Sequence, residues 1–189
     1  MDPESFFRNA RTHPAYWEHY ARTLKRASDL LWSVADDAIG KYMATAAAQG
    51  KKDWLEVAVA GDFDIQLGDP SILLLGASIE NLLKGILVAR GSEGAEIERF
   101  GHRLSDMFRA AGLKPTKRQT WLLKNLQEGI EWRSKYPAPK LSKKAPPVYW
   151  ELERENYPEL LALWDICAKA LDSAWQSSNV PTPNNPLAG

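Results

Sequence analysis

The stretch that decides the fold is "SILLLGASIENLLKGILVARG", residues 71–91. Its apolar residues recur at steps of three and four, which is the period of an α-helix that buries one face. Asp69 is placed to cap this helix, Pro70 suits its first turn, and Gly91 suits its end. The sequence therefore predicts a central helix over about 70–90, with a core stripe formed by Ile72, Leu75, Ile79, Leu82, Leu83 and Ile86.

The segment before this helix is also helical in its pattern. Residues 14–48 predict either two consecutive helices, the second starting near Ser28, or one long kinked helix. The expected core stripe consists of Tyr16, Tyr20, Leu24, Ala27, Leu31, Val34, Ala38 and Tyr42. Residues 49–70 between the two predicted helical regions are interpreted as a long loop because they are rich in glycine and aspartate.

Three further helices follow the central one. A short helix is expected over "HRLSDMFRAAGL", residues 102–113, closed by Gly112. Thr116 and Gln119 form a capping box for a helix that ends near Tyr136, before two prolines. The last helix, about 157–176, has a similar start at Asn156 and is expected to bury Leu160, Leu161, Trp164, Cys167, Leu171 and Trp175. The fold class is therefore all-α, an up-and-down bundle of about five helices.

The 189 residues suffice for one core, so we expect an N-terminal arm (1–13), a single helical domain (14–176) and a disordered tail (177–189). The 24 basic and 24 acidic residues give the whole molecule no positive field that would attract nucleic acid or a membrane. The lone Cys167 lies in an apolar helical pattern and is expected to be a buried, inert thiol.

The sequence carries no pattern of a secreted, membrane or metal-binding protein. The N-terminus lacks a signal-peptide pattern, and polar residues interrupt the most apolar run, so a cytoplasmic protein without membrane contact is expected. Asp62 and Asp64 lack the spacing of an EF-hand, and no metal or cofactor is expected.

Three blocks, "GASIENLLKGILVARG", "GHRLSDMFRAAGL" and "LLKNLQEGIEWRSKYPAP", resemble conserved blocks of prokaryotic HEPN-like helical proteins. The resemblance covers roughly residues 14–176. It implies a helical bundle, frequent dimerisation, and in many members a ribonuclease or toxin with an Arg–x(4–6)–His motif on the last helix.

This chain departs from that motif, since no histidine follows His102 and the expected last helix contains no arginine. The nuclease residues implied by the resemblance therefore cannot be assigned. Arg8 and His13 match the spacing, but they lie in the N-terminal arm and such a match is expected by chance about once in two chains of this composition.

What remains of the resemblance is the "GH" start of a helix, which in noncatalytic members follows a helix with a Glu and Lys pair. The candidate site therefore centres on His102, which is expected to hydrogen-bond Glu80 across the bundle. An imidazole changes protonation near neutral pH, so it can act as an acid, a base or a phosphate contact. The alternative is that His102 only shapes a helix start. Glu80 and Lys84 stand at i and i+4, where they form either a solvated ion pair or part of a polar ligand site.

Trp132, Arg133 and Tyr136 form a second candidate site, because aromatic and basic side chains together can stack bases and hold phosphates. The alternative is that they pack beneath the following proline segment or against a partner subunit. Neighbouring lysines at 135, 140, 143 and 144 are either a phosphate-binding cluster or a solvated loop.

These observations favour a HEPN-like binding or interaction module, in the setting of a defence or toxin–antitoxin type system that the resemblance implies. Two alternatives stay open: an atypical ribonuclease or nucleotide-binding protein that uses His102 with Arg99, Arg103 or Arg133, and a structural partner subunit. Eight tryptophans, with Trp132 and Trp150 outside the expected core, predict a homodimer; RNA, a nucleotide or a protein are the other expected partners.

Overall fold

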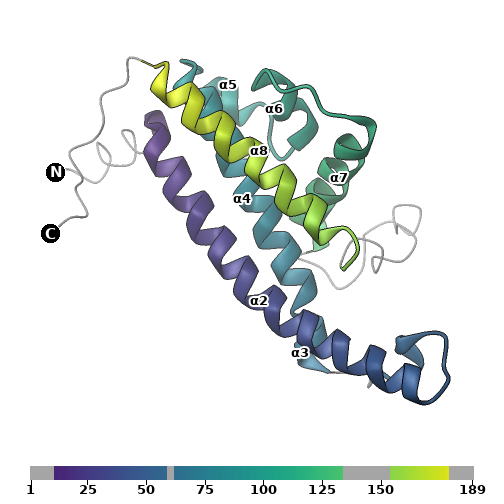
Figure 1. Ribbon diagram of the computed structural model, residues 1–189. Helices are drawn as coiled ribbons and strands as arrows, with labels where there is room; N and C mark the ends of the chain where they lie inside the picture. Colours follow the sequence, from purple (N-terminus) through teal and green to yellow (C-terminus); the bar gives the residue numbers. More distant parts are fainter. Residues whose placement is uncertain (1–10, 59–61, 134–153, 179–189) are drawn as a thin grey trace, which may run out of the picture.

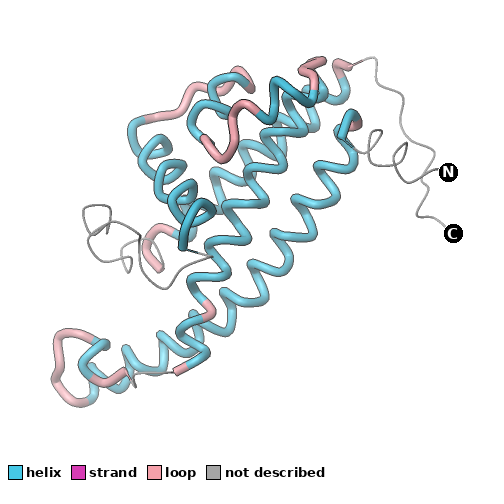
Figure 2. Tube along the Cα trace, turned by 180° about the vertical axis from the view of Figure 1, so that it is seen from behind, coloured by secondary structure: helices cyan, strands magenta, loops and turns pink. Residues whose placement is uncertain are grey.

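The computed structural model describes residues 11–58, 62–133 and 154–178, and all secondary structure in these ranges is helical (Figures 1 and 2). The predicted all-α bundle is confirmed. At its centre lies α4 (Gly68–Ala89), which packs against α2 (Pro14–Ala48) along most of its length and against α8 (Tyr157–Gln176).

The long N-terminal segment is a single helix, α2. Ser28 lies in its middle and starts no second helix, since its hydroxyl donates to the carbonyl oxygen of Ser71 on α4 at 2.9 Å. The Ser71 hydroxyl donates in return to the carbonyl oxygen of Ser28 at 2.9 Å. These reciprocal bonds, both buried, fix the register of α2 against α4.

The predicted core stripe of α2 is wrong for most of its residues. Tyr20 is 63% exposed and Val34 is 39% exposed, whereas the buried stripe contains Ala21, Ser28, Trp32, Ala35, Ala38, Ile39 and Ala46. The face that turns to α4 is rich in small residues, which allow two helix backbones to approach closely. α2 has two apolar stripes, and the smaller side chains form the contact with α4.

The central helix agrees with its prediction in the core and differs at its start. All six residues of its expected stripe are buried. The helix begins at Gly68 with Leu67 as N-cap, so Asp69 lies in the first turn and does not cap. The stretch Phe63–Ala89 is long and apolar enough to cross a membrane, but 72% of its most apolar window is buried inside the bundle.

The predicted loop over 49–70 contains short helices, η1 (Trp54–Glu56) and α3 (Phe63–Gln66). Asp62 caps α3 and accepts a hydrogen bond of 2.7 Å from the Tyr42 hydroxyl. That hydrogen bond lowers the pKa of Asp62 below its ordinary value. Asp62 therefore has a structural role at the protruding end of α2 (Figure 1).

Four short elements follow α4 and pack against it: α5 (Gly94–Glu98), α6 (Leu104–Ala110), α7 (Lys117–Glu128) and the π-helical turn η2 (Gly129–Arg133), of which η2 reaches Gly76 in the first half of α4. The predicted capping box of Thr116 and Gln119 is confirmed, as is Gly112 with φ +69° after α6. The sequence prediction missed α5, which has a capping box of its own formed by Glu93 and Glu96.

The last helix, α8, has the predicted bounds. Leu160, Cys167 and Leu171 are buried as expected, and Leu163 is buried as well, whereas Leu161, Trp164 and Trp175 are only partly buried. Asn156 is the N-cap but its side chain makes no capping bond and instead accepts from the Arg118 guanidinium. Trp150, Tyr136 and the tail 179–189 lie outside the described residues, so the predictions for them stay predictions.

Candidate functional site

The predicted hydrogen bond between His102 and Glu80 is confirmed. Glu80 lies on α4 with its carboxylate almost fully buried, and its Oε2 lies 2.9 Å from His102 Nδ1. Its other oxygen, Oε1, accepts from Lys84 Nζ at 2.6 Å. The Glu80–Lys84 pair is therefore partly buried, not the fully solvated pair that was the alternative. We call Glu80, Lys84 and His102 the polar cluster.

The polar cluster lies where three parts of the chain meet. Lys84 lies over the Trp17 ring of α2, with Nζ 5.7 Å from the ring centroid. Trp17 approaches α4 closely because the residue after Lys84 on α4 is Gly85. A Cβ at Gly85 would lie 3.1 Å from the Trp17 Cβ. His102 comes from the turn between α5 and α6, in which Gly101 has φ +55°.

His102 is the member of the cluster that a ligand can reach, since its side chain is 44% exposed. A carboxylate only accepts hydrogen bonds, so with Glu80 ionised beside Lys84 the His102 Nδ1 carries a proton and donates. The other ring nitrogen, Nε2, is then available for a proton or phosphate contact. The carboxylate holds the ring in one orientation, which is the arrangement of an oriented acid or base.

Two of the three arginines proposed to act with His102, Arg99 and Arg103, do not bind it. Arg103 bends back, so that its Nη2 donates to the Arg99 carbonyl at 2.6 Å and its Nε to the Phe100 carbonyl at 3.1 Å. No hydrogen bond links the side chain of Arg99 or Arg103 to His102 among the described residues. The side chains of Trp132 and Arg133, and all of Tyr136, lie outside the described part of the chain.

The histidine of the N-terminal match has a local structural role. His13 is the N-cap of α2, where its Nδ1 accepts from the Ala15 amide at 3.2 Å. Its ring also packs edge-on against Trp175 of α8, with 5.7 Å between the ring centroids. Arg8 lies outside the described residues.

Next to the polar cluster the surface is cationic, a feature that the sequence analysis missed. Between positions 99 and 118 the only acid is Asp106, whereas six residues are basic and all six are exposed. These are Arg99, Arg103, Arg109, Lys114, Lys117 and Arg118, which we call the cationic surface. The neutral total charge concealed it, and a count of charges along a sliding window would have found it.

The six cations differ in how far other groups neutralise them. Asp106 lies between two guanidinium groups, 3.3 Å from Arg103 and 3.4 Å from Arg109. Arg99, Lys114 and Lys117 form no ion pair with any described residue. These three are the cations with most of their charge left for a ligand.

Arg118 holds α7 against α8. It donates to both carboxylate oxygens of Glu159, at 2.8 and 3.0 Å, and it lies 4.6 Å from the centroid of the Trp121 ring. The pairing raises the pKa of Arg118 and lowers the pKa of Glu159. Arg118 is thus neutralised, while Trp121 stays 37% exposed one turn from Lys117.

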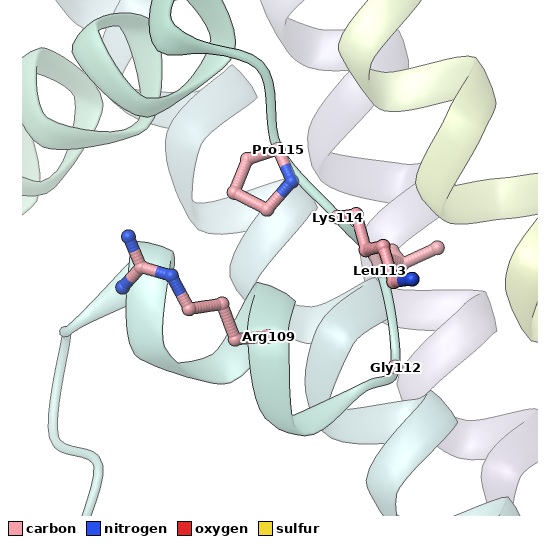
Figure 3. A pocket seen from close by; sticks show the side chains of 5 residues that line it. All are labelled: Arg109, Gly112, Leu113, Lys114 and Pro115. Atoms are coloured by element: carbon pink, nitrogen blue, oxygen red, sulfur yellow. The ribbon is translucent and has the colours of Figure 1, made fainter.

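A shallow pocket of about 360 Å³ lies within the cationic surface, between the end of α6 and the segment that leads to α7 (Figure 3). It is lined by Arg109, Gly112, Leu113, Lys114 and Pro115. Gly112 combines a positive φ with a close neighbour, because a Cβ there would collide with the Arg90 guanidinium. The glycine therefore brings the guanidinium of Arg90 next to this turn.

Comparison of the chain with protein-family models, with curated proteins and with solved structures gives no match. The relationship to HEPN-like proteins stays a prediction, and a function has to be argued from the polar cluster and the cationic surface.

Proposed function

We propose that this protein is a binding module whose ligand is RNA, held by its phosphates on the cationic surface. The observation that carries the proposal is the excess of six exposed basic residues over one acid between positions 99 and 118 of a protein with no net charge. Local positive charge of this kind attracts a phosphate backbone through release of its counterions.

The arrangement of side chains supports a single-stranded ligand. Lys114 and Lys117 carry no ion pair to a described residue, and Trp121 follows one helical turn after Lys117. A base can stack on the exposed part of an indole while neighbouring lysines hold the phosphates, which is how many proteins bind single strands. The pocket beside Arg109 and Lys114 has room for one phosphate group.

Within the setting that the HEPN-like resemblance implies, the protein acts as an RNA-binding component of a defence or toxin–antitoxin type system. The proposal agrees with the absence of the Arg–x(4–6)–His motif from α8, since a module that only binds RNA needs no catalytic acid and base pair.

A second function, an atypical ribonuclease, is favoured by one observation. Glu80 orients the His102 ring at the border of the cationic surface, with the ring partly exposed. Such a histidine can move a proton at a phosphate held nearby. The first function is preferred because, apart from the buried Glu80 that orients its ring, no acid or base is hydrogen-bonded to His102 among the described residues.

The experiment measures binding of a fluorescently labelled 20-nucleotide RNA by anisotropy at low salt. The test variant is Lys114→Glu/Lys117→Glu, and the control is Lys51→Glu/Lys52→Glu, which makes the same charge change at the opposite end of the bundle. We expect the test variant to weaken binding at least about tenfold and the control by less than about twofold.

Equal weakening by the two variants, or no binding by the unchanged protein at micromolar concentration, would contradict the proposal. A DNA strand of the same sequence that binds more tightly would also exclude RNA as the preferred ligand. If the unchanged protein cleaves the RNA and His102→Gln does not, the ribonuclease proposal takes the place of the binding-module proposal.

A further inference from the structure

Arg90, the residue after α4, has a positive charge that no described residue neutralises. Its guanidinium lies against the backbone of Gly112, since a Cβ at that glycine would collide with Arg90 Nη1. Arg90 is exposed, and its side chain forms no hydrogen bond or ion pair with a described residue. The N–H donors of this guanidinium are therefore available to a ligand.

The end of α6 does not account for the position of Arg90. A basic side chain near a helix C-terminus often donates to the last carbonyl groups of the helix. Three of the last four carbonyls of α6 already accept from backbone amides, namely those of Met107, Phe108 and Arg109. Arg90 donates to none of the four. It is therefore not the cap of α6.

Arg90 is a third cation at the pocket between α6 and α7. Gly112, against which its guanidinium lies, lines this pocket of about 360 Å³. Arg109 and Lys114 line it as well, and Figure 3 shows Arg109 on α6, across the pocket from Pro115. Cations from the end of α4, from α6 and from the following turn thus meet at one small pocket.

The charge at the pocket matches a doubly charged phosphate. Asp106 is shared between Arg109, at 3.4 Å, and Arg103, at 3.3 Å. If Asp106 neutralised Arg109 completely, Arg90 and Lys114 would still remain, because neither forms an ion pair with a described residue. A phosphate inside an RNA strand carries one negative charge, whereas a phosphate at the end of a strand carries about 1.5 to 2 near pH 7. The two remaining positive charges therefore favour the end phosphate.

The types of cation also fit an end phosphate. Such a group presents three free oxygens, whereas a phosphate inside a strand presents two. A guanidinium binds two phosphate oxygens side by side, and a lysine ammonium binds a further oxygen as a point charge. Arg90 and Lys114 together can thus bind all three oxygens.

We infer that this pocket binds the terminal phosphate of an RNA strand through Arg90, Arg109 and Lys114. A strand is favoured over a free nucleotide or a phosphorylated protein because Lys117 and Trp121 continue from the pocket along α7, where a second phosphate and a base can bind. The inference rests on the proposed RNA binding and adds that one end of the strand fixes its position on the cationic surface.

The first test compares three 20-nucleotide RNAs of one sequence by fluorescence anisotropy at low salt. One has a 5′-phosphate, one has a 3′-phosphate, and one has hydroxyl groups at both ends; the label is on an internal base in all three. One of the phosphorylated RNAs should bind at least about fivefold more tightly than the hydroxyl RNA, because the added charge and oxygen meet the cations of the pocket. Uridine monophosphate should displace it only at much higher concentration, because it lacks the contacts along α7.

The second test removes one charge. Arg90→Gln should reduce the preference for the phosphorylated RNA to less than about twofold, mainly by weakening the binding of that RNA. The matched variant is Arg99→Gln, which changes another exposed arginine without an ion pair to a described residue, outside the pocket lining. It should weaken the binding of all three RNAs by the same factor and keep the preference.

The third test keeps every charge and moves one of them. Gly112→Ala places a Cβ where the Arg90 guanidinium lies, so it should displace the guanidinium and also reduce the preference. Gly50→Ala is the control for backbone strain, since φ is +68° at Gly50 and +69° at Gly112, but a Cβ at Gly50 would meet no atom within 4 Å. It should keep the preference, and circular dichroism checks that both variants are folded.

Equal affinity for all three RNAs would overturn this inference and leave the proposed RNA binding in place. If none of the RNAs binds, the proposed function is contradicted and the inference is lost with it. A preference that survives in both Arg90→Gln and Gly112→Ala would place the end phosphate at another site. Uridine monophosphate or a phosphoserine peptide that competes as strongly as the phosphorylated RNA would exclude the strand as the ligand.

Discussion

His102 and Glu80 join the turn between α5 and α6 to the central helix, with 2.9 Å between Nδ1 and Oε2. The two residues are 22 positions apart in the chain, and Glu80 is buried whereas His102 is partly exposed. The same carboxylate accepts from Lys84, so one buried negative charge orders both a surface histidine and a lysine over Trp17.

Glu80→Ala should lower the free energy of unfolding by about 1–3 kcal/mol, because it leaves Lys84 and His102 without their buried partner. Urea unfolding followed by circular dichroism measures the change. Glu98→Ala is the control, since Glu98 forms an ion pair with Arg11 in which both side chains are about 70% exposed. Its effect should be below about 0.5 kcal/mol, and an equal loss in both variants would show that burial of Glu80 does not matter.

Gly85→Ala should destabilise the protein although alanine favours helices. A Cβ at this position would lie 3.1 Å from the Trp17 Cβ and 3.2 Å from both terminal carbons of Leu171, so α2, α4 and α8 would have to separate. Overpacking of this kind costs about 1–3 kcal/mol, more than the gain in helix propensity of about 0.5–1 kcal/mol.

The matched variant is Gly94→Ala, because a Cβ at Gly94 would meet no atom within 4 Å. Thermal unfolding should show a lower midpoint for Gly85→Ala and a change of no more than a few degrees for Gly94→Ala. A higher midpoint for Gly85→Ala would mean that the helices accommodate the methyl group.

The core of the bundle was predictable where one apolar stripe and clear end signals agree. Residues 71–91 have one dominant stripe and Thr116 has its capping partner, so both predictions are confirmed. α2 has two apolar stripes, and the one with Tyr20 and Val34 has the larger side chains. Periodicity alone therefore favours that stripe as the core face. In the fold, the close approach of α2 to α4 places the stripe of smaller side chains in the contact. The sequence of α2 alone does not show that α4 packs so closely against it.

The candidate site was predictable only in part. The spacing of Glu80 and Lys84 predicted their ion pair, and the resemblance to HEPN-like proteins, through the "GH" helix start after a helix with a Glu and Lys pair, suggested the contact of His102 with Glu80 that the structure contains. The cationic surface was missed because only the charge of the whole chain was considered, and that total is zero, although the six cations lie within residues 99–118, along α6 and up to the start of α7. Neither periodicity nor motif spacing detects such an arrangement.

The buried Cys167 predicts a loss of stability at alkaline pH. Burial raises the pKa of its thiol above the ordinary value of about 8.5. The folded state therefore holds the proton more tightly than the unfolded chain, so stability is fully present below about pH 8.5. As the pH rises beyond this value, the unfolded chain releases the proton and the free energy of unfolding falls by about 1.4 kcal/mol per pH unit.

Cys167→Ser is the control, since a serine hydroxyl does not titrate in this range. Urea unfolding in the presence of a reductant, measured between pH 8 and 10, should show the slope in the unchanged protein and a flatter dependence in the variant. Burial also raises the pKa of Tyr157, so both proteins should lose further stability above about pH 10. Parallel curves for the two proteins between pH 8 and 10 would contradict the assignment of the slope to Cys167.

The salt dependence of RNA binding gives the last prediction, because it counts the phosphates that the cationic surface neutralises. For a single strand, the logarithm of the binding constant falls with the logarithm of salt concentration by about 0.7 per phosphate contact. Arg99, Lys114 and Lys117 are the three cations of this surface without an ion pair to a described residue, so we expect a slope of about −2.

Lys114→Ala/Lys117→Ala should reduce the slope to about −0.7, whereas Lys51→Ala/Lys52→Ala should leave it unchanged. A slope near zero in the unchanged protein would mean that phosphate contacts do not carry the binding, and an equal change in both variants would mean that the contacts lie elsewhere on the bundle.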